Sequence, residues 1–161
     1  LEMFCEDFKP EGEIFDNFLM NTVIPYVENN FPVCTDRQNV AVCGSSSGGL
    51  MSFFSAFEHP EKFGYAGVFS PAFLCYTRED WAKYLSTKIV ENMPYLYIYT
   101  GNGDELEEMI FESTEMLYEL LEESFYPYDR MNEVILFENA HNEKSWREIF
   151  PDFLHTFLSR L

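Results

Sequence analysis

One serine in this chain has the neighbours expected of a catalytic nucleophile. Ser46 lies at the centre of the motif G-x-S-x-G, between Gly44 and Gly48. Serine enzymes that use this motif place the serine at the tip of a tight strand-to-helix turn, where its Oγ is exposed. Small neighbours let the backbone close such a turn without a Cβ clash. Neither Ser45 nor Ser47 has a glycine two residues away on both sides, so Ser46 is the predicted nucleophile.

The residues around Ser46 predict the strand and the helix that this turn requires. The apolar run VAVC at 40–43 precedes the motif, and the apolar run LMSFF at 50–54 follows it. A Gly/Ser run can also be a flexible linker, but linkers are seldom flanked so closely by apolar residues. A helix that starts here points its free N–H groups at the site. We therefore expect the backbone N–H of Ser47 to act as an oxyanion-hole donor.

A nucleophilic serine needs a base, and the chain offers three histidines. His59 stands beside Pro60 at the end of a predicted helix, where capping is the usual role. His155 lies inside the terminal helix, where packing or a surface position is expected. His141 lies in the loop after the last predicted strand, from which an imidazole can reach across to the serine. His141 is the predicted general base.

The third group of such a site is a carboxylate that orients the imidazole. Asp104 follows the predicted strand Tyr95–Thr100, and the chain order Ser46, Asp104, His141 matches that of the α/β-hydrolase fold. Asp104 is the predicted acid. Three alternatives stay open: Asp104 only caps the following helix, Glu105 is the acid, or serine and histidine form a dyad.

Strands and helices alternate along the chain, which predicts a parallel sheet with helices on both faces. Chemistry in such sheets gathers at the carboxyl ends of the strands, where the serine turn, the Asp104 loop and the His141 loop all fall. Residues 1–12 give no clear element, and Pro25 is expected to kink or divide the first helix. The predicted elements are a helix at 13–30, a strand around Val40, the helix after Ser46, a strand at 65–69, a helix from Thr77 to about Asn92, a strand at 95–100, a helix at 105–123, a strand at 133–137 and a helix from about 143 to 160.

Length and charge limit the classes of protein that fit. The 161 residues are expected to form one domain, 1–161, and the net charge of −18 argues against nucleic acid or an anionic membrane as partner. No apolar run approaches the roughly 20 residues of a membrane helix. No signal peptide is visible, so the compartment is unknown. Cys43 is expected to be a buried small hydrophobe, and a Cys5–Cys34 disulfide stays open.

Three segments resemble the putative-esterase family of α/β-hydrolases, which includes enterochelin-type esterases, esterase D and feruloyl or acetyl-xylan esterases. They are GSSSGGLMSFFSAFEHPEKFGYAGVFSPAF around Ser46, YLYIYTGNGDE around Asp104 and AHNEKSWREIFPDFL around His141. The resemblance covers residues 13–160. It implies hydrolysis of a carbohydrate-linked, siderophore-type or small acyl ester through an acyl-enzyme, with no metal and no organic cofactor. It also implies that Trp146 secures the His141 loop by packing, and Arg147 by pairing with a carboxylate.

The chain departs from this family at its front. Family members carry further N-terminal strands, and a loop among them supplies one oxyanion N–H. Here about 38 residues precede the strand before Ser46, and they read as mostly helix, so we expect the carboxyl-terminal part of such a fold. The alternatives are a non-catalytic binding module with a hydrolase fold and an inactive fragment. Exposed aromatic residues would then mark either a partner surface or the site of the missing N-terminal segment, and assembly as a homo-oligomer stays open.

A third hypothesis is a divalent-cation binder. It rests on a run of glutamates that lacks the spacing of a calcium loop and is typical of a solvated helix face, namely Glu105, Glu107, Glu108, Glu112 and Glu115.

Overall fold

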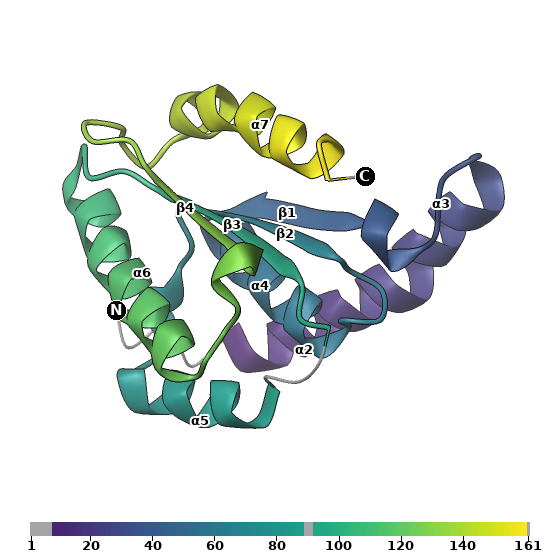
Figure 1. Cartoon of the computed structure of the whole chain (residues 1–161), viewed down its shortest axis with the longest axis horizontal. Helices are drawn as coiled ribbons and strands as arrows, with labels where there is room; N and C mark the ends of the chain where they lie inside the picture. The colour runs from purple at the N-terminus through teal and green to yellow at the C-terminus, as the bar shows by residue number, and fades with distance from the viewer. Residues whose placement is uncertain (1–7, 89–91, 161) are drawn as a thin grey trace.

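Four parallel strands form the centre of the structure, a computed structural model that describes residues 8–88 and 92–160 (Figure 1). The strands lie side by side in chain order, and each is bonded in parallel to the next. Their carboxyl ends therefore meet at one edge of the sheet, as the sequence predicts. The strands are β1 (Ala41–Ser45), β2 (Tyr65–Phe69), β3 (Tyr95–Thr100) and β4 (Met131–Ile135).

Helices cover both faces of this sheet, so the predicted α/β architecture is confirmed (Figure 1). One face carries α4, α5 and α6, with α2 alongside α4, and the opposite face carries α7. The helices are α2 (Phe8–Phe18), α3 (Ile24–Asn30), α4 (Ser47–Glu58), α5 (Arg78–Lys88), α6 (Glu105–Glu123) and α7 (Glu143–Leu158).

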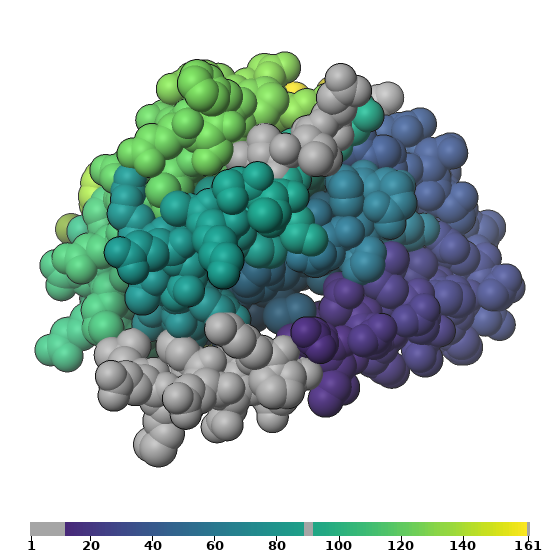
Figure 2. Space-filling view, turned by 90° about the horizontal axis from the view of Figure 1, so that it is seen from below, coloured from purple at the N-terminus to yellow at the C-terminus, as the bar shows by residue number. Residues whose placement is uncertain are grey.

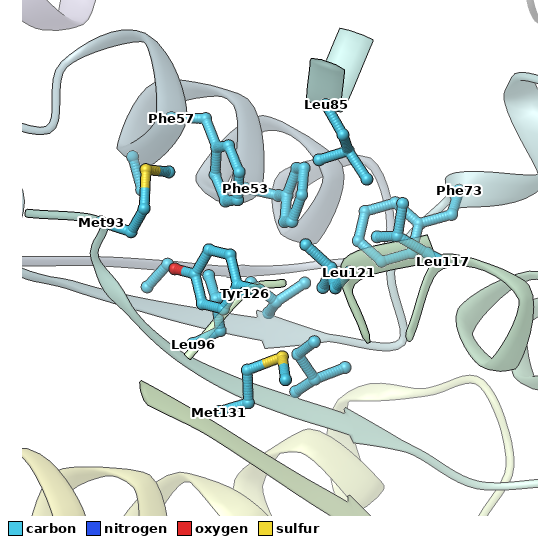
Figure 3. Close-up of a cluster of buried hydrophobic side chains, with 14 of the residues drawn as sticks. Phe53, Phe57, Phe73, Leu85, Met93, Leu96, Leu117, Leu121, Tyr126 and Met131 are labelled. Atoms are coloured by element: carbon cyan, nitrogen blue, oxygen red, sulfur yellow. The ribbon is translucent and has the colours of Figure 1, made fainter. Parts of the chain in front are cut away.

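The larger core lies between the sheet and the three helices α4, α5 and α6 (Figure 3). Alternate strand residues such as Leu96 and Ile98 point to this face, because successive side chains of a strand point to opposite sides. Phe53 of α4 packs face to edge against Phe73 and Trp81, with ring centroids 5.2 and 5.6 Å away. These aromatic contacts fix α4, and with it the serine turn, against the sheet.

A smaller core lies under α7 and contains the tyrosines that alternate along β3. α7 approaches β2 at Gly67, where a Cβ atom would lie 2.9 Å from the ring of Phe153 and 2.8 Å from Cβ of Cys43. Only glycine leaves room for that ring. Gly67 therefore sets the height of α7 above the sheet, and α7 follows directly after the His141 loop.

Two predicted boundaries are wrong, and a third adjoins residues outside the described part of the chain. β4 begins two residues earlier than predicted, and Leu136 and Phe137 are exposed because the chain has already left the sheet there. Helix α2 begins at Phe8, within a stretch that gives no clear element in the sequence. α5 ends at Lys88, and residues 89–91 lie outside the described residues.

Pro25 divides the first helical segment, as predicted. A π-helical turn, Leu19–Val23, joins α2 to α3, and Pro25 occupies the first turn of α3. Proline has no backbone N–H and its ring crowds the preceding turn, so a wider turn before it relieves both problems.

β1 is an edge strand of the described sheet, and its outer side has no partner strand. Cys43 at its centre is exposed, so its predicted burial is wrong. The reason is topological, since an apolar strand residue is buried only where neighbouring elements cover it. Hollows of about 430 and 480 Å³ flank the strand on its two faces, the first lined partly by Phe15 and Met51 and the second by Trp146 and Phe150.

The described residues bear only in part on two expectations from the sequence, which concern a disulfide and membrane helices. Cys5 lies outside the described residues, so its pairing with Cys34 stays a prediction. Among the described helices, none is both long enough and apolar enough to cross a membrane.

Candidate active site

Ser46 is the single residue between the end of β1 and the start of α4, and its backbone has a conformation that non-glycine residues rarely adopt. Its φ is 57° and its ψ is −122°. Three backbone hydrogen bonds hold it there: its N–H donates to the carbonyl of Phe69 at 2.9 Å, and its carbonyl accepts from Leu50 and Ala72. Strain of this kind persists only where the surroundings enforce it, and it projects the serine side chain out of the turn.

The two glycines of the motif do different work. A Cβ on Gly44 would lie 2.5 Å from the carbonyl oxygen of Gly48, so the turn can close only if residue 44 has no side chain. A Cβ on Gly48 would meet nothing within 4 Å. The expectation that both small neighbours are needed for steric reasons is therefore confirmed for Gly44 and wrong for Gly48.

His141 meets Ser46 across the carboxyl edge of the sheet, as the sequence predicts. Its Nε2 lies 2.9 Å from Oγ of Ser46, and its side chain is 11% exposed. Asn142, the next residue, caps α7 by accepting from the N–H groups of Lys144 and Ser145. This cap fixes the point at which the loop turns into the helix, and thereby the position of the imidazole.

The carboxylate beside His141 belongs to Glu107, which the sequence analysis placed on a solvated helix face. Oε2 of Glu107 lies 2.7 Å from Nδ1 of His141, and the residue is 0% exposed. Its other oxygen, Oε1, accepts from the N–H of Gly101 at 2.8 Å and from the hydroxyl of Ser70 at 2.6 Å. A buried carboxylate requires such partners, because unpaired burial of a charge is costly.

Asp104 does not face the imidazole, so the predicted acid is corrected. It is the N-cap of α6: one oxygen accepts from the backbone N–H of Glu107 and the other from that of His141, both at 2.8 Å. The hydrogen bond from Glu107 and the one from His141 lower the pKa of Asp104 below its usual value. Glu105, the other candidate, is an exposed residue of the same helix turn.

Helical geometry explains why the carboxylate that contacts His141 lies three residues beyond Asp104. A capping side chain turns back to the free N–H groups of its own helix, while the residue one turn later can point into the protein. The sequence did contain a signal, since Glu107 is spaced from Ile110, Thr114 and Leu117 as residues of one helix face are. Leu106, the residue before Glu107, lies off that face and is 46% exposed.

Ser47, the predicted oxyanion donor, is the first residue of α4. Its backbone N–H therefore belongs to the first turn of a helix, whose N–H groups have no partner within that helix. It follows Ser46 directly, so this group lies at the same turn as the serine.

Trp146 secures the His141 loop, and Arg147 does not. The indole of Trp146 packs edge to face on the imidazole, with ring centroids 5.1 Å apart, and its Nε1 donates to Oγ of Ser70 at 2.9 Å. Arg147 is exposed and takes part in no ion pair of the described residues. The packing expectation for the tryptophan holds, and the pairing expectation for the arginine is wrong.

A second cluster of histidine, carboxylate and serine lies on the face of the sheet that carries α4, but its contacts have a different order. Nε2 of His59 lies 2.7 Å from Asp16, and Asp16 accepts from the hydroxyl of Ser55 at 3.0 Å. The serine here contacts the carboxylate and not the imidazole, so this histidine is not placed to take its proton. The cluster lies at a hollow of about 450 Å³ between α2 and α4, on the side seen in Figure 2.

The remaining sequence candidates do not gather into a site. His155 is exposed on α7. Within residues 8–88 and 92–160, no group of three or more ligating side chains could hold a metal ion.

Comparison with solved structures finds the same α/β-hydrolase-type fold in known esterases. An enterochelin esterase from Shigella flexneri matches with a TM-score of 0.75 and 19% identity, over 89% of this chain and 36% of that one. A ferulic acid esterase matches with a TM-score of 0.74 and 16% identity, over 91% of this chain and 61% of that one.

Sequence comparison gives the family. Residues 9–157 match the model of the family described as putative esterase, and the chain belongs to that family. A curated relative, the endo-1,4-beta-xylanase/feruloyl esterase of Xylanibacter ruminicola, is 32% identical over 107 residues. That match covers 66% of this chain and 13% of the relative, so the chain spans only a small part of that protein.

Proposed function

We propose that this chain carries the catalytic residues of a serine carboxylic-ester hydrolase. Ser46 is the nucleophile, His141 the general base and Glu107 the carboxylate that orients the base. The observation that supports this assignment is the continuous series of contacts from Ser46 Oγ to His141 Nε2 and from His141 Nδ1 to Glu107. Membership of an esterase family supports ester hydrolysis as the reaction.

The first half of the proposed reaction forms an acyl-enzyme. Oγ of Ser46 attacks the ester carbonyl carbon while its proton passes to Nε2 of His141. Glu107 accepts the hydrogen bond of Nδ1–H and stabilises the imidazolium that forms. The carbonyl oxygen becomes negative and accepts from the N–H of Ser47. Collapse of this intermediate breaks the ester C–O bond, and the alcohol leaves with the proton from His141.

The second half returns the enzyme to its starting state. His141 takes a proton from a water molecule, whose oxygen attacks the acyl carbon. The Ser46 ester bond then breaks, and the serine oxygen recovers a proton from Nε2. The sum is one ester plus one water giving one carboxylic acid plus one alcohol, and no cofactor enters the balance.

The substrate class follows from the relatives and remains part of the proposal. Structural neighbours are an enterochelin esterase and a ferulic acid esterase, and the curated relative is a feruloyl esterase joined to a xylanase. A small-molecule ester, either carbohydrate-linked, siderophore-type or of a small acyl group, is therefore the proposed substrate. The net charge of −18 disfavours polyanionic substrates such as nucleic acids.

Labelling with a fluorophosphonate tests this proposal directly, because the reagent reacts with an activated serine whatever the natural substrate. Intact mass spectrometry should show one adduct on the parent chain and none on Ser46→Ala. Ser86→Ala, which removes an exposed hydroxyl of α5, is the control and should label like the parent. A folded parent chain without an adduct would contradict the proposed function and favour a non-catalytic hydrolase fold.

The two histidines that contact carboxylates provide a second matched pair. His141→Gln should abolish labelling, because Ser46 then has no base. His59→Gln should leave it intact, because Ser55 bonds to Asp16 rather than to the imidazole. Equal labelling of both variants would show that Ser46 does not depend on His141.

A further inference from the structure

Ser70 occupies a position that the proposed reaction does not explain. It follows β2 directly, is 0% exposed and has a φ of 40°. A serine in this conformation is uncommon, and glycine would adopt it without strain. The contacts of this buried hydroxyl therefore bear on why a serine, and not a glycine, occupies the position.

The hydroxyl of Ser70 links the tryptophan of the His141 loop to the buried carboxylate. Nε1 of Trp146 lies 2.9 Å from Oγ of Ser70, and this Oγ lies 2.6 Å from Oε1 of Glu107. An indole nitrogen can only donate, so the serine oxygen accepts from it. The serine hydrogen is then directed to Glu107. Each donor in such a chain polarises the next, and the bond to the carboxylate is charge-assisted.

This bond leaves Glu107 a single orientation. Oε1 accepts both the hydroxyl of Ser70 and the N–H of Gly101. Oε2 is then the oxygen that meets Nδ1 of His141. Rotation of the carboxylate would break one of these bonds in a buried place, where an unpaired acceptor is costly.

The backbone around Ser70 also holds the nucleophile. The carbonyl of Phe69 accepts from the N–H of Ser46, and the N–H of Ala72 donates to the carbonyl of Ser46. The N–H of Ser70 itself donates to Tyr99 at 2.7 Å, at the end of β3. The turn at 69–72 therefore contacts the serine turn through its backbone and the carboxylate through its side chain.

We propose that Ser70 is a positioning residue, whose hydroxyl, fixed by Trp146, holds the Glu107 carboxylate in register with His141. The catalytic importance of this role rests on the proposed function, since it acts through the proposed base. Its structural content does not, because the state of the His141 ring can be observed without turnover.

The test uses Ser70→Gly, Trp146→Phe and the double variant in the full chain. Glycine suits a φ of 40°, so Ser70→Gly removes the hydroxyl without adding backbone strain. Phenylalanine keeps an aromatic ring against His141 but cannot donate. Ser70→Ala is the second variant, to be used if Ser70→Gly does not fold. It removes the same hydroxyl and leaves the backbone strain at residue 70 unchanged.

The readout is the pH titration of the His141 ring signals by NMR, together with the signal of its Nδ1 proton. Removing a donor leaves more negative charge on Glu107, which favours the protonated imidazole. The titration midpoint of His141 should therefore move to higher pH in both single variants, and the double variant should move no further. Fluorophosphonate labelling of Ser46 should slow by roughly 10- to 100-fold, the loss expected for one hydrogen bond to a charged group.

Ser55→Ala is the matched control. Ser55 is also a buried serine that donates to a carboxylate beside a histidine, so its loss should move the His59 signals and leave those of His141 unchanged. A folded Ser70→Gly with unchanged His141 signals would overturn the proposal. A shift in Ser70→Gly but none in Trp146→Phe would remove Trp146 from it. Absence of labelling in the parent contradicts the proposed function alone, because the NMR result stands without it.

Discussion

At the scale of single residues, two carboxylates one helix turn apart have separate tasks. Asp104 accepts from two backbone N–H groups and ties the start of α6 to the His141 loop. Glu107 contacts the imidazole itself. Asp104 contacts the backbone of His141, and Glu107 contacts its ring. Comparing a substitution at each position therefore separates support of the loop from orientation of the proposed base.

Amide substitutions at these two positions should have very different effects. Glu107→Gln keeps the shape of the side chain but removes the charge that stabilises the imidazolium, so labelling of Ser46 should slow by roughly 100- to 10,000-fold. Asp104→Asn keeps one acceptor at the N-cap, where asparagine is also favoured, and loses only the second hydrogen bond, from the N–H of His141, so labelling should stay within about tenfold of the parent. The measurement is the rate of fluorophosphonate labelling by intact mass. The reverse order of effects would restore Asp104 as the acid.

At the scale of elements, the turn between β1 and α4 depends on one glycine more than the other. Gly44→Ala places a Cβ 2.5 Å from the carbonyl of Gly48 and should destabilise the fold by about 2 kcal/mol or more. Gly48→Ala meets no atom within 4 Å and should change stability by less than about 1 kcal/mol. Urea unfolding of the two variants beside the parent measures both values, and comparable losses would mean that the turn closes differently.

The contact between β4 and α6 makes stability depend on pH. Burial, followed by the hydrogen bond and the negative charge of Glu115, raises the pKa of Glu133 to about 7. A pKa that is higher in the folded state gives a contribution that is full below about pH 4.3, the value of an unfolded glutamate, and is lost as pH rises through 7. Above pH 7 the folded protein carries a charge that this site disfavours.

Glu133→Gln should therefore become more stable relative to the parent as pH rises from 5 to 8. We expect a gain of about 1–2 kcal/mol at pH 8, reduced from the full linkage value because the site is partly solvated. Thermal unfolding at a series of pH values measures it. Glu112→Gln, an exposed position on the same helix, is the control and should run parallel to the parent. A constant difference between Glu133→Gln and the parent across this range would rule out the linkage.

The sequence predicts the bounds of a helix or strand well where one pattern of apolar residues runs along the whole element and ends with it. β2, β3 and α6 have the predicted bounds because an apolar run or a helical pattern ends sharply at Gly, Pro or Asp. The end of β4 could not be predicted, since Leu136 and Phe137 continue an apolar run that the sheet does not cover. Ser46 and His141 could be predicted from motif and loop position. Glu107 was missed although its spacing places it on the apolar face of α6, because Asp104 lies nearer the end of the predicted strand and the other glutamates of the helix suggest a solvated face.

At the scale of the whole molecule, the described chain is a parallel sheet that is covered on both faces and open along β1 (Figure 1). The chain spans 36% of the enterochelin esterase, 61% of the ferulic acid esterase and 13% of the curated feruloyl esterase that it matches. The hollows on both sides of β1 lie at this open edge. The position of Ser46 thus depends on a strand that is bonded on one side, while Glu107 lies on α6 and His141 in the loop after β4.

The open edge gives the serine a second equilibrium besides global folding. Strands bonded on one side separate from a sheet at lower free energy than central strands do, so β1 can open locally while the core stays folded. In the open form, Ser46 would lose the hydrogen bond that it donates to Phe69 and the one that it accepts from Ala72, and it would no longer face His141. If Ser46 is the nucleophile that we propose, we expect its labelling rate to be the intrinsic rate of the closed site multiplied by the fraction of time for which β1 is closed.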